Sequence, residues 1–412
     1  MIRVGRVLGI ATLVCALVGG TAASAPSKTR TTKLTTVTVD TLPIANGLPL
    51  DLGIKKGFFE QQGIAIKKQL LQSGNDIVLA LANHNGDIGY LGYVPMMIAR
   101  TNGIPLTLIA ASEVEGTSDA DNWQEILVKS SSSIRTPAEL AGKTIAVNAL
   151  KGVGEVIIKA ALKKRGVDPN SVKLLALPFP SMRSALNNGQ VDAIWTPEPF
   201  LSQALNIDSA RIVMSPGPVL GNYFPNGGYA VRSDGLAQNK DLARRFQLAI
   251  NESLNYARTH PDEIRAMLPA GTQNVRLPIW SPLIDRPQLL QLAKYAKEFG
   301  VITTLPNMTQ LAPSSIRSGT ATGLLEASVG PGATLTLKFA GGTAKRLDPG
   351  KYLVIVKDRS KTLGLRLRGP GVSKATGVGK RGTFRWTVSL TAGRYTYSAV
   401  GGRARGGSFR VS

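Results

Sequence analysis

Cysteine and histidine are almost absent from this sequence. Its 412 residues include one cysteine, Cys15, and two histidines, His84 and His260. Because Cys15 lies in an N-terminal apolar stretch, the rest of the chain has no thiol for a disulfide, a nucleophile or a metal site. Each histidine is most simply a surface residue. We therefore expect no cofactor and no metal, and we expect that the protein is not an enzyme.

Long apolar runs are also missing after residue 25, where no segment reaches the roughly 20 residues that span a bilayer. The first 25 residues are typical of a secretory signal, with Arg3 and Arg6 before apolar residues 7–18 and small residues up to Ala25. This signal predicts a periplasmic, cell-surface or extracellular protein. Cleavage after Ala22, Ala23 or Ala25 stays open, as does the choice between lipidation and removal of Cys15.

Three regions follow the signal. In residues 36–311 strands alternate with helices, which predicts an α/β fold with largely parallel sheets. Residues 312–323 are rich in Ser, Thr and Gly and read as a linker. Residues 324–412 contain short alternating runs between Gly and Pro, which is typical of a small all-β domain.

The α/β region gives the clearest local signals. Strands are expected at 36–40, 64–71, 88–91 and 144–148, with helices at 48–62, 76–83 and 155–165. Thr136 and Glu139 form a capping box before a short helix. Residues 80–95 and 184–199 share one order (helix end, Asn-Gly, Asp, apolar strand, Pro), which suggests two lobes of similar construction.

Two strand-to-helix junctions are candidate ligand sites. Residues 73–76 (SGND) follow one predicted strand and residues 149–154 (ALKGVG) follow another, one in each presumptive lobe. Helix N-termini have unpaired backbone N–H groups that favour anions. Plain connecting turns would give the same pattern, so the junctions alone leave the function open.

Longer motifs carry a family resemblance. Residues 48–64 (LPLDLGIKKGFFEQQGI), 139–147 (ELAGKTIAV) and 189–200 (GQVDAIWTPEPF) resemble the nitrate/sulfonate/taurine-type periplasmic binding proteins, which include pyrimidine-precursor types. The resemblance implies a type II periplasmic binding protein fold with two lobes, spanning residues 36–311. Lobe one would be about 36–128 and 227–311, and lobe two about 130–226.

The same resemblance implies a cleft between the lobes. Its ligand-binding residues would be Asn46, Gly74, Asn75, Gly92, Tyr93, Lys151, Gly152, Trp195, Glu198, Asn226, Gly228 and Tyr229. Amides and aromatics suit a small polar ligand. Tyr93 and Trp195 are also consistent with core packing, Lys151 with a solvated lysine, and Glu198 with a helix cap.

These features predict the solute-binding component of an ABC importer, a monomer that closes two lobes on a small solute and presents it to a permease and its ATPase. Sulfonate, taurine, nitrate and pyrimidine precursors all fit the family. A surface adhesion protein remains an alternative. An enzyme on the same fold is disfavoured, because the enzymes that share it use cysteine or histidine chemistry.

The last region is strongly basic. Residues 312–412 contain 18 Lys and Arg against 3 Asp and Glu, a net charge of +15 within the chain's +23. Alternation predicts a β-sandwich with inward rows Leu363, Leu365, Leu367; Phe384, Trp386, Val388, Leu390; Tyr395, Tyr397; and Phe409, Val411, leaving Arg366, Arg368, Arg385, Arg394 and Arg410 outside.

Residues 347–412 resemble a bacterial cupredoxin-like domain. The positions of its copper ligands are Leu363, Ala399 and Gly402 here, and no Cys, His or Met follows Met308, so copper is excluded. The charge either solubilises the protein or attracts an anionic envelope polymer or lipid headgroups. An exported protein rarely meets nucleic acid, so no nucleic-acid partner is expected.

Overall fold

The computed structural model describes residues 34–411, apart from positions 117, 222, 270–271, 273–274, 317–322, 333, 340–341 and 348–349. The predicted signal at 1–25 and half of the predicted linker lie outside the described residues. None of the helices in the described part is long and apolar enough to cross a bilayer.

The first sheet has six strands in the order β11-β4-β10-β3-β1-β2. Its bounds are β1 (Thr35–Thr41), β2 (Ile64–Leu70), β3 (Ile88–Gly92), β4 (Leu106–Val114), β10 (Pro225–Arg232) and β11 (Ile279–Trp280). β1 is parallel to β2 and β3, whereas β10 runs antiparallel to β3 and β4. Every residue of β4 is buried, as expected for a central strand with both faces covered.

The helices packed with this sheet begin with η1 (Ala45–Gly47), α1 (Leu48–Lys55), α2 (Phe58–Gln61), α3 (Gly74–Ala82) and α4 (Tyr93–Thr101). Those after β10 are α9 (Ser233–Gln238), α10 (Lys240–Thr259), α11 (Pro261–Arg265), α12 (Arg286–Glu298) and α13 (Met308–Leu311). The single helix predicted at 48–62 is wrong. Gly57 adopts φ +74° between α1 and α2, a left-handed conformation that glycine allows and that ends the first helix.

The second sheet has the order β7-β6-β8-β5-β9. Its strands are β5 (Gln124–Val128), β6 (Thr144–Val147), β7 (Lys173–Ala176), β8 (Ala193–Pro197) and β9 (Arg211–Met214), with η2 (Pro137–Leu140), α5 (Val153–Lys164), α6 (Phe179–Asn187), α7 (Phe200–Asn206) and α8 (Pro216–Leu220). The parallel strands β7-β6-β8 repeat the order β2-β1-β3 of the first sheet, so the units 80–95 and 184–199 occupy equivalent places.

The chain crosses between the two sheets twice, from β4 to β5 and from β9 to β10. The expected extension of the first lobe to residue 128 needs correction, because β5 pairs with β8 and β9 of the second sheet. β5 is buried throughout. A short strand that is buried on both faces has no alternation to indicate which sheet it joins.

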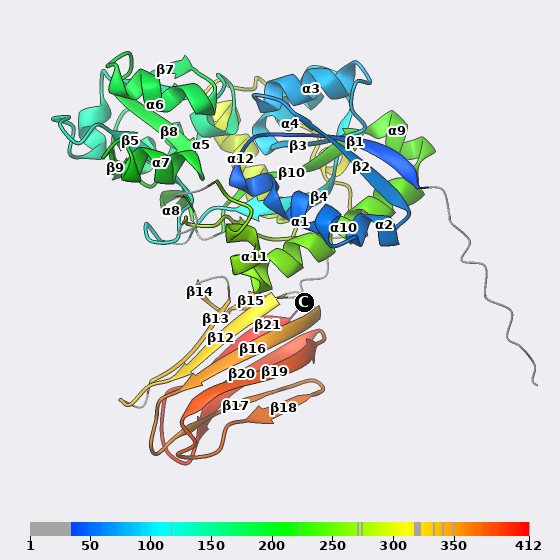
Figure 1. Ribbon diagram of the computed structural model, residues 1–412, viewed down its shortest axis with the longest axis vertical. Helices are drawn as coiled ribbons and strands as arrows, with labels where there is room; N and C mark the ends of the chain where they lie inside the picture. The colour runs from blue at the N-terminus through cyan, green and yellow to red at the C-terminus, as the bar shows by residue number, and fades with distance from the viewer. Residues whose placement is uncertain are drawn as a thin grey trace, which may run out of the picture. The chain divides into compact units, whose positions relative to one another are not determined.

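The C-terminal strands form two five-stranded sheets, β14-β13-β12-β16-β19 and β15-β21-β20-β17-β18 (Figure 1). The first contains β12 (Gly323–Val329), β13 (Leu335–Phe339), β14 (Gly342–Thr343), β16 (Gly350–Asp358) and β19 (Gly382–Leu390). The second contains β15 (Arg346–Leu347), β17 (Gly364–Gly369), β18 (Val372–Ala375), β20 (Gly393–Val400) and β21 (Gly407–Val411).

Side chains from these strands share one buried cluster, as in a β-sandwich. The predicted alternation is confirmed in β17, where Leu365 and Leu367 are buried and Arg368 is exposed. Phe384 and Trp386 of the predicted inward rows pack only at the margin of this cluster, because β19 is an edge strand.

Candidate functional site

Each of the two predicted junctions begins a helix, and a side chain of the protein caps each helix. At the start of α3, the Ser73 hydroxyl oxygen accepts a hydrogen bond from the backbone N–H of Asp76 at 3.2 Å and donates one to its carboxylate at 2.7 Å. At the start of α5, the backbone N–H of Lys151 donates to Glu155 at 2.8 Å. The capping group is therefore a hydroxyl at α3 and a carboxylate at α5, and only the second places a negative charge of the chain on a backbone N–H.

The two junctions lie against each other. The side-chain amide of Asn75 donates to the carbonyl oxygen of Leu150 at 3.3 Å, which links the start of α3 to the loop before α5. A second link joins the lobes where the backbone N–H of Ala45 donates to the carbonyl oxygen of Glu198 at 2.9 Å. These two hydrogen bonds place the junctions, and the lobes that carry them, in contact.

Glycine at position 92 permits this close approach. A Cβ there would lie only 3.1 Å from the side chain of Val153, the first residue of α5. A larger side chain at the end of β3 would therefore push the two lobes apart.

Two buried glutamates mark the end of β4, where the chain leaves the first sheet. Glu113 and Glu115 are 1% and 0% exposed. Glu113 accepts a hydrogen bond from the Tyr90 hydroxyl at 2.8 Å, and Glu115 accepts one from the Asn226 amide at 2.6 Å. Burial raises the pKa of each carboxyl to about 7.

Several predicted site residues converge on these glutamates. Asn226 bonds Glu115, and the buried side-chain amide of Asn46 lies near Glu113, where it lowers the pKa of that carboxyl and so partly offsets the effect of burial. Tyr93 and Tyr229 are buried beside Glu113, where burial first and the nearby carboxylate second raise the pKa of each phenol. Gly228 leaves room for Tyr93, whose hydroxyl would lie 3.0 Å from a Cβ at position 228.

A second carboxylate pair lies on the other sheet. Glu125 of β5 and Glu198 after β8 are both buried, and burial raises the pKa of Glu125 to about 8 and that of Glu198 in the same direction. The Arg276 guanidinium donates to Glu125 at 2.9 Å, while its backbone N–H donates to Glu198 at 3.2 Å. Arg276 thus holds both glutamates from one position.

Other predicted residues lie apart from Glu113 and Glu115. Lys151 is exposed. Gly74 packs against Pro95, which a Cβ at position 74 would approach to 2.9 Å. Gly152 caps the start of α5 with an extended backbone. Glu198 caps α7 through the backbone N–H and the hydroxyl of Ser202, at 3.0 and 2.9 Å.

Trp195 packs in the core of the second lobe. Its ring lies 6.1 Å from that of Phe179, and a Cβ at Gly154 would approach it to 2.5 Å. Its Nε1 is buried and has no hydrogen-bond partner among the described residues.

Sequence reasoning missed Glu113, Glu115, Glu125 and Arg276. The available signal was two glutamates, in the order Glu-Val-Glu, at the end of the otherwise uncharged run 104–112. Charged residues are rarely buried without a reason, so glutamates at the end of a buried strand are candidates for function.

The chemistry of this set is that of a hydrogen-bond acceptor. Glu113 and Glu115 each keep one buried oxygen, Oε2, without a partner in the described structure. Such oxygens can accept hydrogen bonds from an ammonium, an amidine or an amino group. Among the described residues, no group of three or more His, Cys, Asp or Glu side chains is placed to hold a metal ion.

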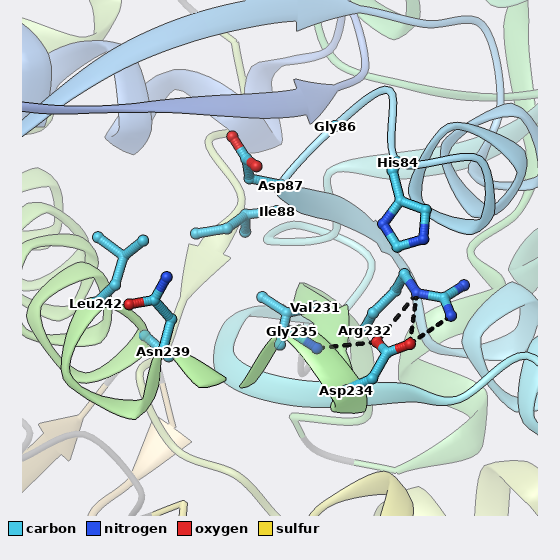
Figure 2. A pocket seen from close by; sticks show the side chains of 11 residues that line it. His84, Gly86, Asp87, Ile88, Val231, Arg232, Asp234, Gly235, Asn239 and Leu242 are labelled. Carbon is cyan, nitrogen blue, oxygen red and sulfur yellow. Dashed lines mark hydrogen bonds and ion pairs between the residues drawn. The ribbon is translucent and has the colours of Figure 1, made fainter. Parts of the chain in front are cut away.

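A separate cavity of about 280 Å³ lies at the beginning of β3 (Figure 2). The junctions meet near the other end of that strand, where Gly92 approaches Val153. It is lined by residues that include His84, Asp87, Arg232 and Asp234. Arg232 and Asp234 form an ion pair at 2.6 Å, and Asp87 accepts a hydrogen bond from the backbone N–H of Thr38 at 2.7 Å. Because these charges are already satisfied, the cavity offers less to a polar ligand than the buried glutamates do.

Two sheets of matching order, joined by two crossings and meeting at their strand-to-helix junctions, define the two-lobed periplasmic binding protein fold of type II. The family model described as NMT1/THI5 like matches residues 45–264, which is more than half of the chain. The chain therefore belongs to the NMT1/THI5-like family.

Similar proteins include the taurine-binding periplasmic protein of Escherichia coli (strain K12), 30% identical over 142 residues, which are 34% of this chain and 42% of that protein. A putative aliphatic sulfonates-binding protein of Bacillus subtilis (strain 168) is 31% identical over 221 residues, covering 52% and 64% of the two chains. The matched region thus spans about half the length of these relatives.

Solved structures share the fold. The alkanesulfonate-binding protein SsuA from Xanthomonas axonopodis pv. citri, bound to MOPS, aligns with a TM-score of 0.55 and 20% identity over 68% of this chain and 97% of that one. The periplasmic nitrate-binding protein NrtA from Synechocystis PCC 6803 aligns with a TM-score of 0.56 and 14% identity, over 69% and 87% of the chains.

Proposed function

We propose that this protein is the exported solute-binding component of an ABC importer, which captures a small solute between its lobes and presents it to a permease and ATPase. The observation that carries the proposal is the buried Glu113–Glu115 pair beside the crossing from the first lobe to the second. Keeping two carboxyl groups out of water is costly, and a solute that donates hydrogen bonds to them would offset the cost.

The solute class follows from the same residues. Among the family's ligands, a plain anion such as nitrate would meet the buried carboxyl groups of Glu113 and Glu115, and at α5 it would compete with the Glu155 carboxylate for the backbone N–H of Lys151. A taurine-like zwitterion or a pyrimidine precursor carries an amino group, from which these carboxylates can accept hydrogen bonds. We propose a solute with at least one amine, amidine or ring amino group.

Closure of the lobes is the proposed mechanism. The bonds from Asn75 to Leu150 and from Ala45 to Glu198 join the lobes in the closed arrangement. A solute that bonds residues of both lobes favours that arrangement by its additional contacts. The permease would then recognise the closed form.

Matched solutes test this proposal by thermal unfolding. Taurine should raise the melting temperature, whereas isethionate, which has a hydroxyl in place of the amine, should not. An aminopyrimidine should likewise raise the melting temperature more than the same ring without its amino group. A solute at 100 times its Kd adds about 2.7 kcal/mol of stability. Stabilisation by nitrate or isethionate equal to that by the amino compounds would contradict the solute class.

The substitution Asn75→Ala should weaken solute binding about 3- to 10-fold, because it removes one hydrogen bond across the lobes. Isothermal titration with the best solute of the panel measures the effect. Asn83→Ala is the matched control, since Asn83 lies at the other end of the same helix, away from the junction. Equal affinities in the two variants would remove Asn75 from the site.

A further inference from the structure

The second sheet of the C-terminal sandwich carries arginines side by side on its outer face. Arg346, Arg410 and Arg394 lie in register on the neighbouring strands β15, β21 and β20, and all three are exposed. Positions in register point to the same face of a sheet, on strands about 4.8 Å apart. Like charges directly opposite each other destabilise a sheet, so the pair Arg394 and Arg410 does not serve the fold.

The basic face continues along the sheet. Arg368 pairs in register with Thr396, and Arg366 with Ser398, so hydroxyl groups alternate with guanidinium groups. Arg394 donates to the hydroxyl of Ser408 at 3.1 Å. Guanidinium and hydroxyl donors together are the groups that recognise phosphate oxygens.

A hollow adjoins this face. It has a volume of about 420 Å³, and its lining includes Ser398, Arg403 and Arg405. Both arginines are exposed. The hollow therefore extends the same set of donors beyond the end of β20.

Carboxylates are absent from this face in the described part of the sandwich. Glu326 lies on β12 of the other sheet, and Asp358 is buried, where it accepts hydrogen bonds from Ser360 and Thr376. The described carboxylates of the sandwich therefore do not neutralise the positive potential of Arg366, Arg368, Arg394 and Arg410.

We propose that this face, formed by Arg366, Arg368, Arg394 and Arg410, binds a linear phosphate-bearing polymer of the cell envelope. Its outward side chains are arginine, serine and threonine apart from Ala375 and the half-buried Val400, so it offers little apolar surface to enter a bilayer. A row of separate donors fits repeated phosphates along a chain better than it fits a membrane surface. The proposal is independent of the solute cleft and would hold the protein near the envelope.

The test compares two triple variants of the full chain. Arg368→Gln with Arg394→Gln and Arg410→Gln should lower the affinity for linear inorganic polyphosphate at least 10-fold. The slope of log K against log salt concentration should become less steep by about 2–3, since each lost phosphate contact reduces this slope by nearly one. The control, Lys338→Gln with Lys357→Gln and Lys380→Gln, removes the same charge from exposed positions elsewhere and should change the slope by less than about 1.

An equal loss in both triples would show that net charge alone attracts the polymer and would overturn the proposal. Tighter binding to phosphatidylglycerol vesicles than to polyphosphate, per phosphate, would overturn it in favour of a membrane surface. Near-ultraviolet circular dichroism checks the fold. If the first triple variant unfolds, the single variants Arg368→Gln and Arg394→Gln replace it in the test. Each should reduce the slope of log K against log salt by about 1, and an unchanged slope in both would refute the site.

Discussion

Replacing Glu113 with glutamine is expected to stabilise the solute-free protein at pH 8 by about 3 kcal/mol. Burial raises the pKa of this carboxyl from 4.5 to about 7, and each pKa unit corresponds to about 1.4 kcal/mol. At pH 8 the folded protein must hold an ionised group in a buried position, whereas the unfolded chain ionises it in water. Glutamine keeps the shape and removes the charge.

The sign of the pH dependence follows from the raised pKa. Below about pH 4.5 the carboxyl is protonated in both states, so the unmodified protein and the Glu113→Gln variant should have similar stability. Between pH 4.5 and about 7 the unfolded state releases its proton first, so the stability of the unmodified protein falls as pH rises. Above about pH 7 the difference stays constant. Urea unfolding in each of these three pH ranges measures the effect.

The matched control is Glu60→Gln, on the exposed surface of α2, which should change stability by less than about 0.5 kcal/mol at each pH. A Glu113→Gln protein that loses stability at pH 8 would show that the ionised carboxylate stabilises the fold, against this account.

The same substitution should weaken binding of an amino solute about 10- to 100-fold, because hydrogen bonds to a charged group are worth about 1.5–3 kcal/mol. Binding of an ammonium group at about pH 6 should also release protons, because the ligand favours the ionised carboxylates. Titration calorimetry in buffers of different ionisation enthalpy measures the number released. Gain of stability with loss of binding would identify Glu113 as a group kept for function.

Local sequence rules predicted most elements of the fold. Capping and turn signals placed η2 and α5 correctly, and Gly142 and Gly166 end their segments at φ +76°. The candidate site was harder to predict from the sequence. Helix N-termini suggested anion binding, but the hydrogen bonds that cap them, from the Asp76 N–H to the Ser73 hydroxyl and from the Lys151 N–H to Glu155, depend on side-chain conformations that the motif does not specify.

The buried glutamates show the same limit in another form. Glu113 and Glu125 lie in strands whose other residues are mostly apolar, and only the pairing of β4 with β10 and of β5 with β8 buries them. Arg276 reaches Glu125 from 151 positions along the chain. A contact of this separation follows from topology, so local pattern cannot reveal it.

The largest expected loss of stability comes from Trp195→Ala, at about 3–5 kcal/mol, because it leaves a cavity against Phe179 and α5 in the second lobe. Phe200→Ala is the control, since Phe200 is half-buried and stacks on the same Phe179 at 6.1 Å; its cost should be smaller. Trp195→Phe should retain most of the stability. If the unpartnered Nε1 of Trp195 donates a hydrogen bond to the solute, Trp195→Phe should weaken solute binding while the lobe stays folded.

Gly154 supplies an internal check on this packing. A Cβ at position 154 would lie 2.5 Å from the indole, so Gly154→Ala should cost about 1–3 kcal/mol when Trp195 is present. In the Trp195→Ala background the added methyl group enters the cavity, and alanine also gains about 1 kcal/mol over glycine within a helix. The same substitution should then stabilise the protein. A double-mutant cycle by urea unfolding measures this change of sign, and additive effects would show that the two residues do not pack as described.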